Sequence, residues 1–280
     1  MAHRGSLSER SEILDVSFWV PLVMKMLTSA AIVVLASLLV ERTGPFLGAM
    51  IVTLPISAGP AYAFLALDHG SDFIAASALA GLPVSAATVV YMIVYAIAAQ
   101  RFGVLASVGC ALCVWVASIW LILKGQWSLG SALALNMAVY AVAIPVARRF
   151  SASRVTVAPK KRKWDVPFRA ALVMSVVGIT VLAGRAFGPS IAAAAALAPV
   201  VLISLALILQ PRVGGVAAAS VVANGVPGML GFVGALSLLH LSAVRLGTTA
   251  SLLLALAVSV GWNATLIAVR RWRSYERAGA

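Results

Sequence analysis

Acidic residues are scarce in this chain, and none lies in the middle of an apolar stretch. The sequence has 8 Asp and Glu residues against 21 Lys and Arg, and only 10% of its residues are charged. Membrane enzymes that act on phosphates need acidic metal ligands, and many ion-coupled carriers use an intramembrane carboxylate. Neither has a candidate here, although unwound backbone carbonyls and hydroxyls can hold sodium instead.

Sequence motifs of enzymes are also missing. The chain has no P-loop, zinc-ligand spacing or dinucleotide fingerprint. Cys110 and Cys113 have no His, Asp or Glu nearby, so we expect them to pack as small apolar side chains. His240 and Ser57 would make a protease dyad, but the G-x-S-x-G elbow that such a dyad needs is absent. We therefore expect no catalytic residue, cofactor or metal site, and no enzyme activity.

Apolar residues dominate the rest of the sequence. They make up 62% of it, whereas soluble proteins are roughly 45–50% apolar, so we expect an all-α polytopic membrane protein. The basic residues gather in a loop, Arg148 to Lys163, and in the tail, Arg270 to Arg277. This distribution is typical of cytoplasmic loops in membrane proteins. The expected partner is therefore the lipid bilayer and not a nucleic acid; a homo-oligomer is compatible with the sequence.

The sequence contains an internal repeat with an offset of 144 residues. Residues 25–124 align without a gap to residues 169–268 with 21 identities. The matched glycines and prolines carry most weight, because these residue types constrain the backbone. They include Gly44-Pro45 with Gly188-Pro189, Pro55 with Pro199, Gly70 with Gly214, Gly81 and Pro83 with Gly225 and Pro227, and Gly103 with Gly247.

Apolar stretches predict nine transmembrane helices, with two four-helix repeats joined by a connecting helix. An odd number of spans before the second copy inverts that copy in the membrane; a re-entrant hairpin within 213–242 would raise the count to ten. The spans are 17–40, 43–67, 73–100, 102–123, 128–146, 166–184, 187–211, 213–242 and 246–269. The regions are a polar arm (1–15), the first repeat (16–124), the connecting helix (125–147), a basic linker (148–165), the second repeat (166–269) and a basic tail (270–280).

Prolines interrupt several of these spans, above all the second and the seventh. Proline removes a backbone hydrogen bond, and such a break survives in hydrocarbon only where protein or a wet cavity covers it. Broken spanning helices form substrate sites in transporters. The expected helix breaks are Pro55, Pro83, Pro199 and Pro227, and the expected solute contacts are Thr53, Ser57, Gly59, Tyr62, Asn136 and Asn224. The alternative is that these polar groups satisfy one another between packed helices.

Two further features have more than one interpretation. Lys25 and Arg169 occupy equivalent positions in the two copies. Each is expected to extend to the membrane interface, and their recurrence leaves solute contact as an alternative. Tyr91 and Tyr95 share a helical face; they line a path or join an interfacial aromatic belt, and the belt is favoured for Tyr95.

The expected function follows from these features. The organisation resembles, in a general way, secondary transporters with inverted repeats and proline-broken helices. We expect a transporter of a small neutral or anionic solute, because no acidic residue lies at depth and helix amino ends favour negative charge. A channel or passive facilitator is the alternative, followed by a membrane enzyme or a structural membrane partner. Location in the inner cell membrane is expected.

A topology reporter tests the expected orientation. With the linker in the cytosol, 15 of the 21 Lys and Arg residues lie inside, which predicts a cytoplasmic C-terminus and an external N-terminus. A reporter inserted at position 155 should therefore be active on the cytoplasmic side, as should one fused after residue 280. Activity of the position-155 fusion outside the cell would contradict the inverted arrangement.

Overall fold

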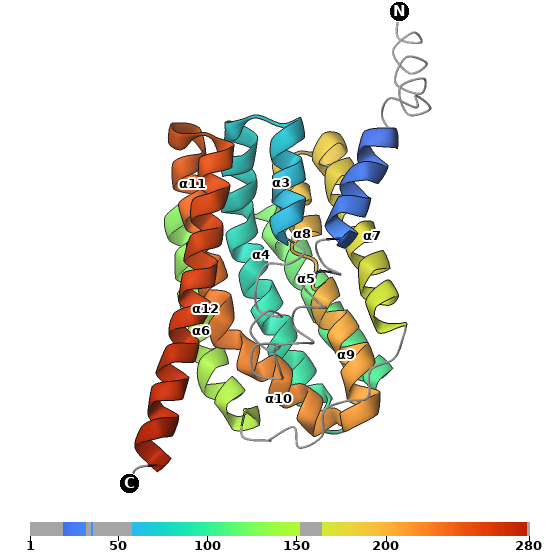
Figure 1. Ribbon diagram of the computed structural model, residues 1–280, viewed down its shortest axis with the longest axis vertical. Coiled ribbons are helices and arrows are strands. Elements are labelled where there is room, and N and C mark those ends of the chain that lie inside the picture. The colour runs from blue at the N-terminus through green and yellow to red at the C-terminus, as the bar shows by residue number, and fades with distance from the viewer. Residues whose placement is uncertain (1–18, 32–34, 36–57, 152–163, 279–280) are drawn as a thin grey trace, which may run out of the picture.

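The protein is a bundle of helices. The computed structural model describes residues 19–31, 35, 58–151 and 164–278, and every regular element in these ranges is helical. The all-α architecture expected from the sequence is thus confirmed, and Figure 1 shows most helices running along the long axis. In chain order the helices after residues 19–31 are α3 (Ala58–Asp68), α4 (Ser71–Ala98), α5 (Val104–Lys124), α6 (Leu129–Phe150), α7 (Asp165–Phe187), α8 (Pro189–Ala196), α9 (Val200–Val213), α10 (Gly215–Gly225), the 3-10 turn η1 (Val226–Gly228), α11 (Met229–Leu246) and α12 (Thr248–Ala278).

Seven segments of the described residues are long and apolar enough to cross a bilayer, which requires about 20 residues. They coincide with the third to ninth expected spans, and they make the chain a multi-pass membrane protein. The first two expected spans, 17–40 and 43–67, fall partly outside the described residues, so the count of nine stays a prediction. The seven segments are Ser71–Ala98, Val104–Lys124, Leu129–Phe150, Asp165–Phe187, Pro189–Val213, Gly215–Leu246 and Thr248–Val269.

The chain passes back and forth between two ends of the bundle (Figure 1). The upper end in that view carries the connections from α3 to α4, α5 to α6, α7 to α8 and α11 to α12. The lower end carries the connections from α4 to α5 and from α9 to α10, together with the end of α12. We use "upper end" and "lower end" for these two sides of the protein.

Helix starts in the two halves follow the sequence offset. α4 begins at Ser71 and α10 at Gly215, while α5 begins at Val104 and α12 at Thr248, so each pair of starts is 144 residues apart. The turns before α10 and α12 are made by Gly214 and Gly247, whose φ angles of 84° and 79° favour glycine. In Figure 1, α4 runs from the upper to the lower end, whereas α10 and α11 run from the lower to the upper end.

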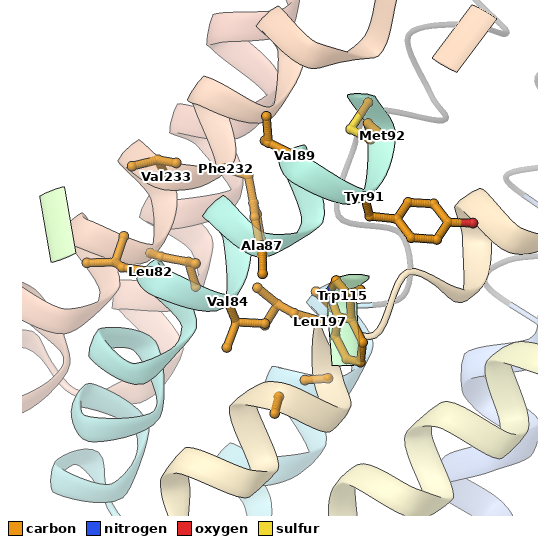
Figure 2. Packing of buried hydrophobic residues seen from close by; sticks show 14 of the residues in the cluster. Leu82, Val84, Ala87, Val89, Tyr91, Met92, Trp115, Leu197, Phe232 and Val233 are labelled. Carbon is orange, nitrogen blue, oxygen red and sulfur yellow. The ribbon is translucent and has the colours of Figure 1, made fainter. Parts of the chain in front are cut away.

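Helix α4 occupies the centre of the bundle. It packs against α5, α6, α8, α10 and α11, and buried side chains lie on every side of it, as expected for a helix that is apolar all round. Figure 2 shows this packing, with Leu82 and Val84 of α4 near Phe232 and Val233 of α11. The outer helices α5, α6 and α12 instead expose apolar residues such as Leu105, Met137 and Leu253, which suits contact with lipid.

The expected break at Pro83 is wrong, because α4 continues through that residue. The carbonyl of Leu82 beside it accepts hydrogen bonds from the Ser85 hydroxyl at 2.7 Å and from the Asn136 amide at 2.9 Å. Side chains can thus satisfy the backbone that a proline disturbs, and the helix continues without ending. The sequence shows the proline but not the partner on α6.

Pro199 and Pro227 do lie at helix discontinuities. α8 ends at Ala196 and α9 begins at Val200. In the tight turn between them, the Val200 amide nitrogen lies 2.7 Å from the Ala198 carbonyl oxygen, to which it donates. Pro227 lies in the 3-10 turn η1 between α10 and α11. Pro55 lies outside the described residues. The discontinuity around Pro199 is the stronger of the two, because residues 197–199 belong to neither helix.

The contact between α11 and α12 depends on Gly231. A Cβ atom at this position would lie 2.7 Å from Cβ of Trp262, an atom that cannot rotate away. The Trp262 indole also donates to the Pro227 carbonyl at 2.9 Å. The glycine therefore sets the spacing of the two helices where α10 passes into α11.

Substitution of Gly231 tests this spacing. Gly231→Ala should lower the melting temperature in detergent by several degrees, since overpacking costs about 1–3 kcal/mol. Gly109→Ala in α5 is the matched control, because a Cβ there meets no atom within 4 Å and alanine favours helix. Equal melting temperatures for the two variants would contradict the close contact.

Candidate solute site

The discontinuity between α8 and α9 is a place where backbone groups lie free of helical hydrogen bonds. Part of the backbone at this break is capped locally: the amides of Leu197 and Ala198 donate to the carbonyls of Ala193 and Ala195, and the Val200 amide donates to the Ala198 carbonyl. The remaining end groups of α8 and α9 have no partners within their own helices. Leu197 in the turn is buried and packs in the central cluster, and α8 contacts α4. Polar backbone is thus placed inside the bundle, beside the central helix.

Four of the six expected solute contacts lie in the described residues, and Thr53 and Ser57 lie outside them. Gly59 is half-buried at the start of α3, where an added Cβ would meet no atom of the described residues within 4 Å. No described residue therefore blocks the approach of another group to the Gly59 backbone.

Tyr62 joins α3 to α4. Its side chain is 2% exposed, and its hydroxyl donates to the Ser77 carbonyl at 3.0 Å. The hydroxyl oxygen lies over Gly81, at 2.9 Å from where a Cβ would stand. Gly81 is therefore needed for the approach of Tyr62, and the tyrosine hydroxyl has only its acceptor capacity left for a ligand.

Asn136 uses both of its amide donors and one of the two acceptor sites of its oxygen within the protein. It is buried on α6, and its amide donates to the carbonyls of Leu82 and Ala132, each at 2.9 Å. Its oxygen accepts from the Ser85 hydroxyl at 3.2 Å. This arrangement supports the packing interpretation for Asn136 over solute contact.

Asn224 differs from Asn136 in its surroundings. It is half-buried in the last turn of α10, and its amide donates to the carbonyl of Ser220 at 2.8 Å. No donor to its side-chain oxygen is found within the described residues. The side-chain oxygen of Asn224 therefore accepts no bond from the described residues, and it lies next to the α10–α11 discontinuity.

Tyr91 is a further candidate for solute contact. The sequence shows only that it shares a helical face with Tyr95. It is 1% exposed on α4, and among the described residues its hydroxyl has no hydrogen-bond partner. Figure 2 shows its ring near Trp115 and Leu197, with the hydroxyl pointing away from the α4 axis. A buried hydroxyl without a partner is costly, so this group is free to bind a polar ligand. Tyr140 of α6 is buried with an unpartnered hydroxyl as well.

Two other expectations are corrected, and the structure shows a partner for His240. The belt interpretation of Tyr95 is wrong, because this residue is fully buried and donates to Gln210 at 3.0 Å. Cys110 and Cys113 are exposed on α5 and do not pack in the core. One ring nitrogen of His240 is used in packing, since Nδ1 donates to the Ala75 carbonyl at 2.9 Å.

The centre of the bundle is mainly apolar, and its buried polar side chains are uncharged over the described residues. Its polar groups are hydroxyls, amides and backbone atoms, and no group of three His, Cys, Asp or Glu residues in the described ranges could hold a metal ion. Charged side chains lie towards the ends of the helices. Such a set of groups binds by hydrogen bonding, and it offers no acid–base pair for catalysis.

No protein-family model, curated protein or solved structure matches this chain, so its function is inferred from the site alone.

The two asparagines give a test of which groups are structural. Asn136→Ala should lower the free energy of unfolding by about 0.5–1.5 kcal/mol, because the Leu82 carbonyl loses one of its two donors and the Ser85 hydroxyl loses the Asn136 oxygen. Asn224→Ala should cost less, since only bonds within its own helix are lost. Melting in detergent measures both, with Met137→Ala on the exposed face of α6 as control. A larger loss for Asn224→Ala would reverse the assignment.

Proposed function

We propose that this protein is a secondary transporter of a small neutral or anionic solute, working by alternating access between two inverted repeats. The observation that carries the proposal is the discontinuity between α8 and α9, packed against α4 inside a bundle of membrane-spanning helices. Irregular backbone at membrane depth is tolerated only where it is covered by protein or lines a cavity, and in transporters it coordinates the substrate.

The direction of equivalent helices supports the inverted arrangement. α4 and the α10–α11 pair start 144 residues apart and cross the bundle in opposite directions (Figure 1). Two copies of opposite orientation can exchange conformations, which gives one form open to each side of the membrane. We place the inner membrane as the location and the lower end in the cytosol, because the linker and tail carry most of the basic residues.

The uncharged centre of the bundle supports a neutral or anionic solute. Tyr91 and Asn224 offer a hydroxyl and an amide oxygen, and the amino end of α9 favours negative charge. The same centre supports a transporter over an enzyme, because the described residues bring no titratable pair together there. It also supports a transporter over a wide channel, since apolar side chains fill the space around α4 (Figure 2).

A solute screen is the first experiment. Intracellular and medium metabolites of a deletion strain and an overexpressing strain should differ in a small set of neutral or anionic compounds. The purified protein in liposomes should then take up that compound with saturation and show counterflow, whereas a channel shows neither. Absence of any difference in metabolites or uptake would contradict the proposal.

Tyr91→Phe tests the site once a solute is identified. Because the hydroxyl has no partner among the described residues, its removal should leave the melting temperature unchanged or raise it. Uptake should fall about tenfold, which corresponds to about 1.4 kcal/mol of lost binding. Tyr62→Phe serves as the contrast, since it loses the bond to Ser77 and should lower stability. Normal uptake by Tyr91→Phe would place the site elsewhere.

A further inference from the structure

Two ion pairs tie helices together at opposite ends of the bundle. At the upper end, Lys25 in the helix of residues 19–31 pairs with Asp68, the last residue of α3. Both side chains are 13% exposed. Lys25 is therefore engaged within the protein, in addition to lying near a helix end.

At the lower end, Arg212 near the end of α9 pairs with Asp165 at the start of α7. The two guanidinium nitrogens donate to the two carboxylate oxygens at 2.7 and 2.6 Å. The side chains are 23% and 19% exposed. Such a fork-to-fork pair is both strong and geometrically specific.

The two ion pairs join equivalent elements. The offset of 144 residues carries Asp68 onto Arg212 and Lys25 onto Arg169, so the acid of the first pair is replaced by a base. An arginine at 169 would repel Arg212, and the second pair instead uses Asp165, which lies four residues earlier, about one helical turn. Each copy thus links the start of its first helix to the end of its second helix, with reversed charge and at the opposite end of the protein.

Helix α9, the second helix of the second copy, has a break at its start and an ion pair near its end. α9 is continuous from Val200 to Val213, with the discontinuity around Pro199 before it and Arg212 near its far end. A groove of about 980 Å³ lies beside this far end, lined by Trp164, Phe168, Leu207 and Ile208 among others. Gln210, one turn before the end of α9, also accepts a hydrogen bond from Tyr95 and donates one to the Phe102 carbonyl. Release of Arg212 would therefore remove one of two ties at this end, and a turn of α9 about residues 197–199 towards the groove would also need the bonds of Gln210 to part.

We propose that the Lys25–Asp68 and Asp165–Arg212 pairs are alternating latches, each of which closes one end of the solute path. This inference rests on the proposed transport function. Both pairs are formed in the structure, which in this proposal is a form with both ends closed. The pairs are largely buried, so opening one end costs free energy unless water reaches the released charges.

Accessibility of a single cysteine tests the latches without any solute. The exposed Cys110 and Cys113 are replaced by Ser, and Gly59→Cys, where a side chain meets no described atom, provides the reporter. A membrane-impermeant maleimide is applied to right-side-out and to inside-out vesicles. Labelling from each side then reports which end of the path is open.

Loss of one latch should open one end only. Asp68→Asn or Lys25→Gln should raise labelling from the upper side at least threefold and reduce labelling from the lower side. Asp165→Asn or Arg212→Gln should do the opposite. The exchanged pairs Lys25→Asp with Asp68→Lys, and Asp165→Arg with Arg212→Asp, should return labelling towards that of the parent. Lys124→Gln and Arg101→Gln remove a charge at the upper and lower end without touching either pair, and should change nothing.

The outcomes separate the latches from the transport function. Unchanged labelling in all four single variants, or an increase on the same side for both pairs, would overturn the latch proposal. In that case the proposed transport function would still be decided by the uptake assay. Opposite labelling changes together with a failed solute screen would support the latches and contradict only the choice of a transported solute.

Discussion

Backbone polar groups inside a membrane must find partners within the protein, and this constraint governs the whole structure. Where a proline disturbs α4, the hydroxyl of Ser85 and the amide of Asn136 donate to the Leu82 carbonyl, and the helix continues. Around Pro199 the helix ends and restarts. The first interruption is repaired by a side chain from another helix, and the second is closed only by local backbone bonds of its own turn. We take this difference to separate the part of the core that holds the fold from the part that is available for a solute.

Small residues make the repaired core possible. Alanine and glycine let neighbouring helices approach α4 and α11 closely enough for side chains to reach backbone atoms. Gly81 accommodates the Tyr62 hydroxyl, and Gly231 accommodates Trp262. The close contacts bring donors such as Asn136 within reach of carbonyls on another helix. Close packing and satisfaction of polar groups therefore depend on the same residues.

The sequence predicts the helical class and the seven described spans, because apolar length alone decides whether a segment crosses a bilayer. It also predicts the discontinuity at Pro199. It does not predict that Pro83 is tolerated within α4. Asn136, which contacts Ser85 and the Leu82 carbonyl beside this proline, lies on another helix, 51 positions after Ser85 in the sequence. The Tyr95–Gln210 bond spans 115 positions, which is why an interfacial position for Tyr95 was the natural but wrong expectation. For Tyr91, the sequence shows the hydroxyl but not the absence of a partner.

The charges at the two ends complete this division between core and boundary. A lone charge at membrane depth is costly, so charged groups serve best where helices meet water. The pairs Lys25–Asp68 and Asp165–Arg212 are placed there. If the first helix of one copy met the second helix of the other, Lys25 would face Arg212 and Asp68 would face Asp165, with repulsion in each case. In the structure each pair lies within its own copy and at its own end of the protein. The interface between copies is then left to apolar and hydrogen-bonded contacts around α4, which can slide or tilt without leaving a buried charge unpaired.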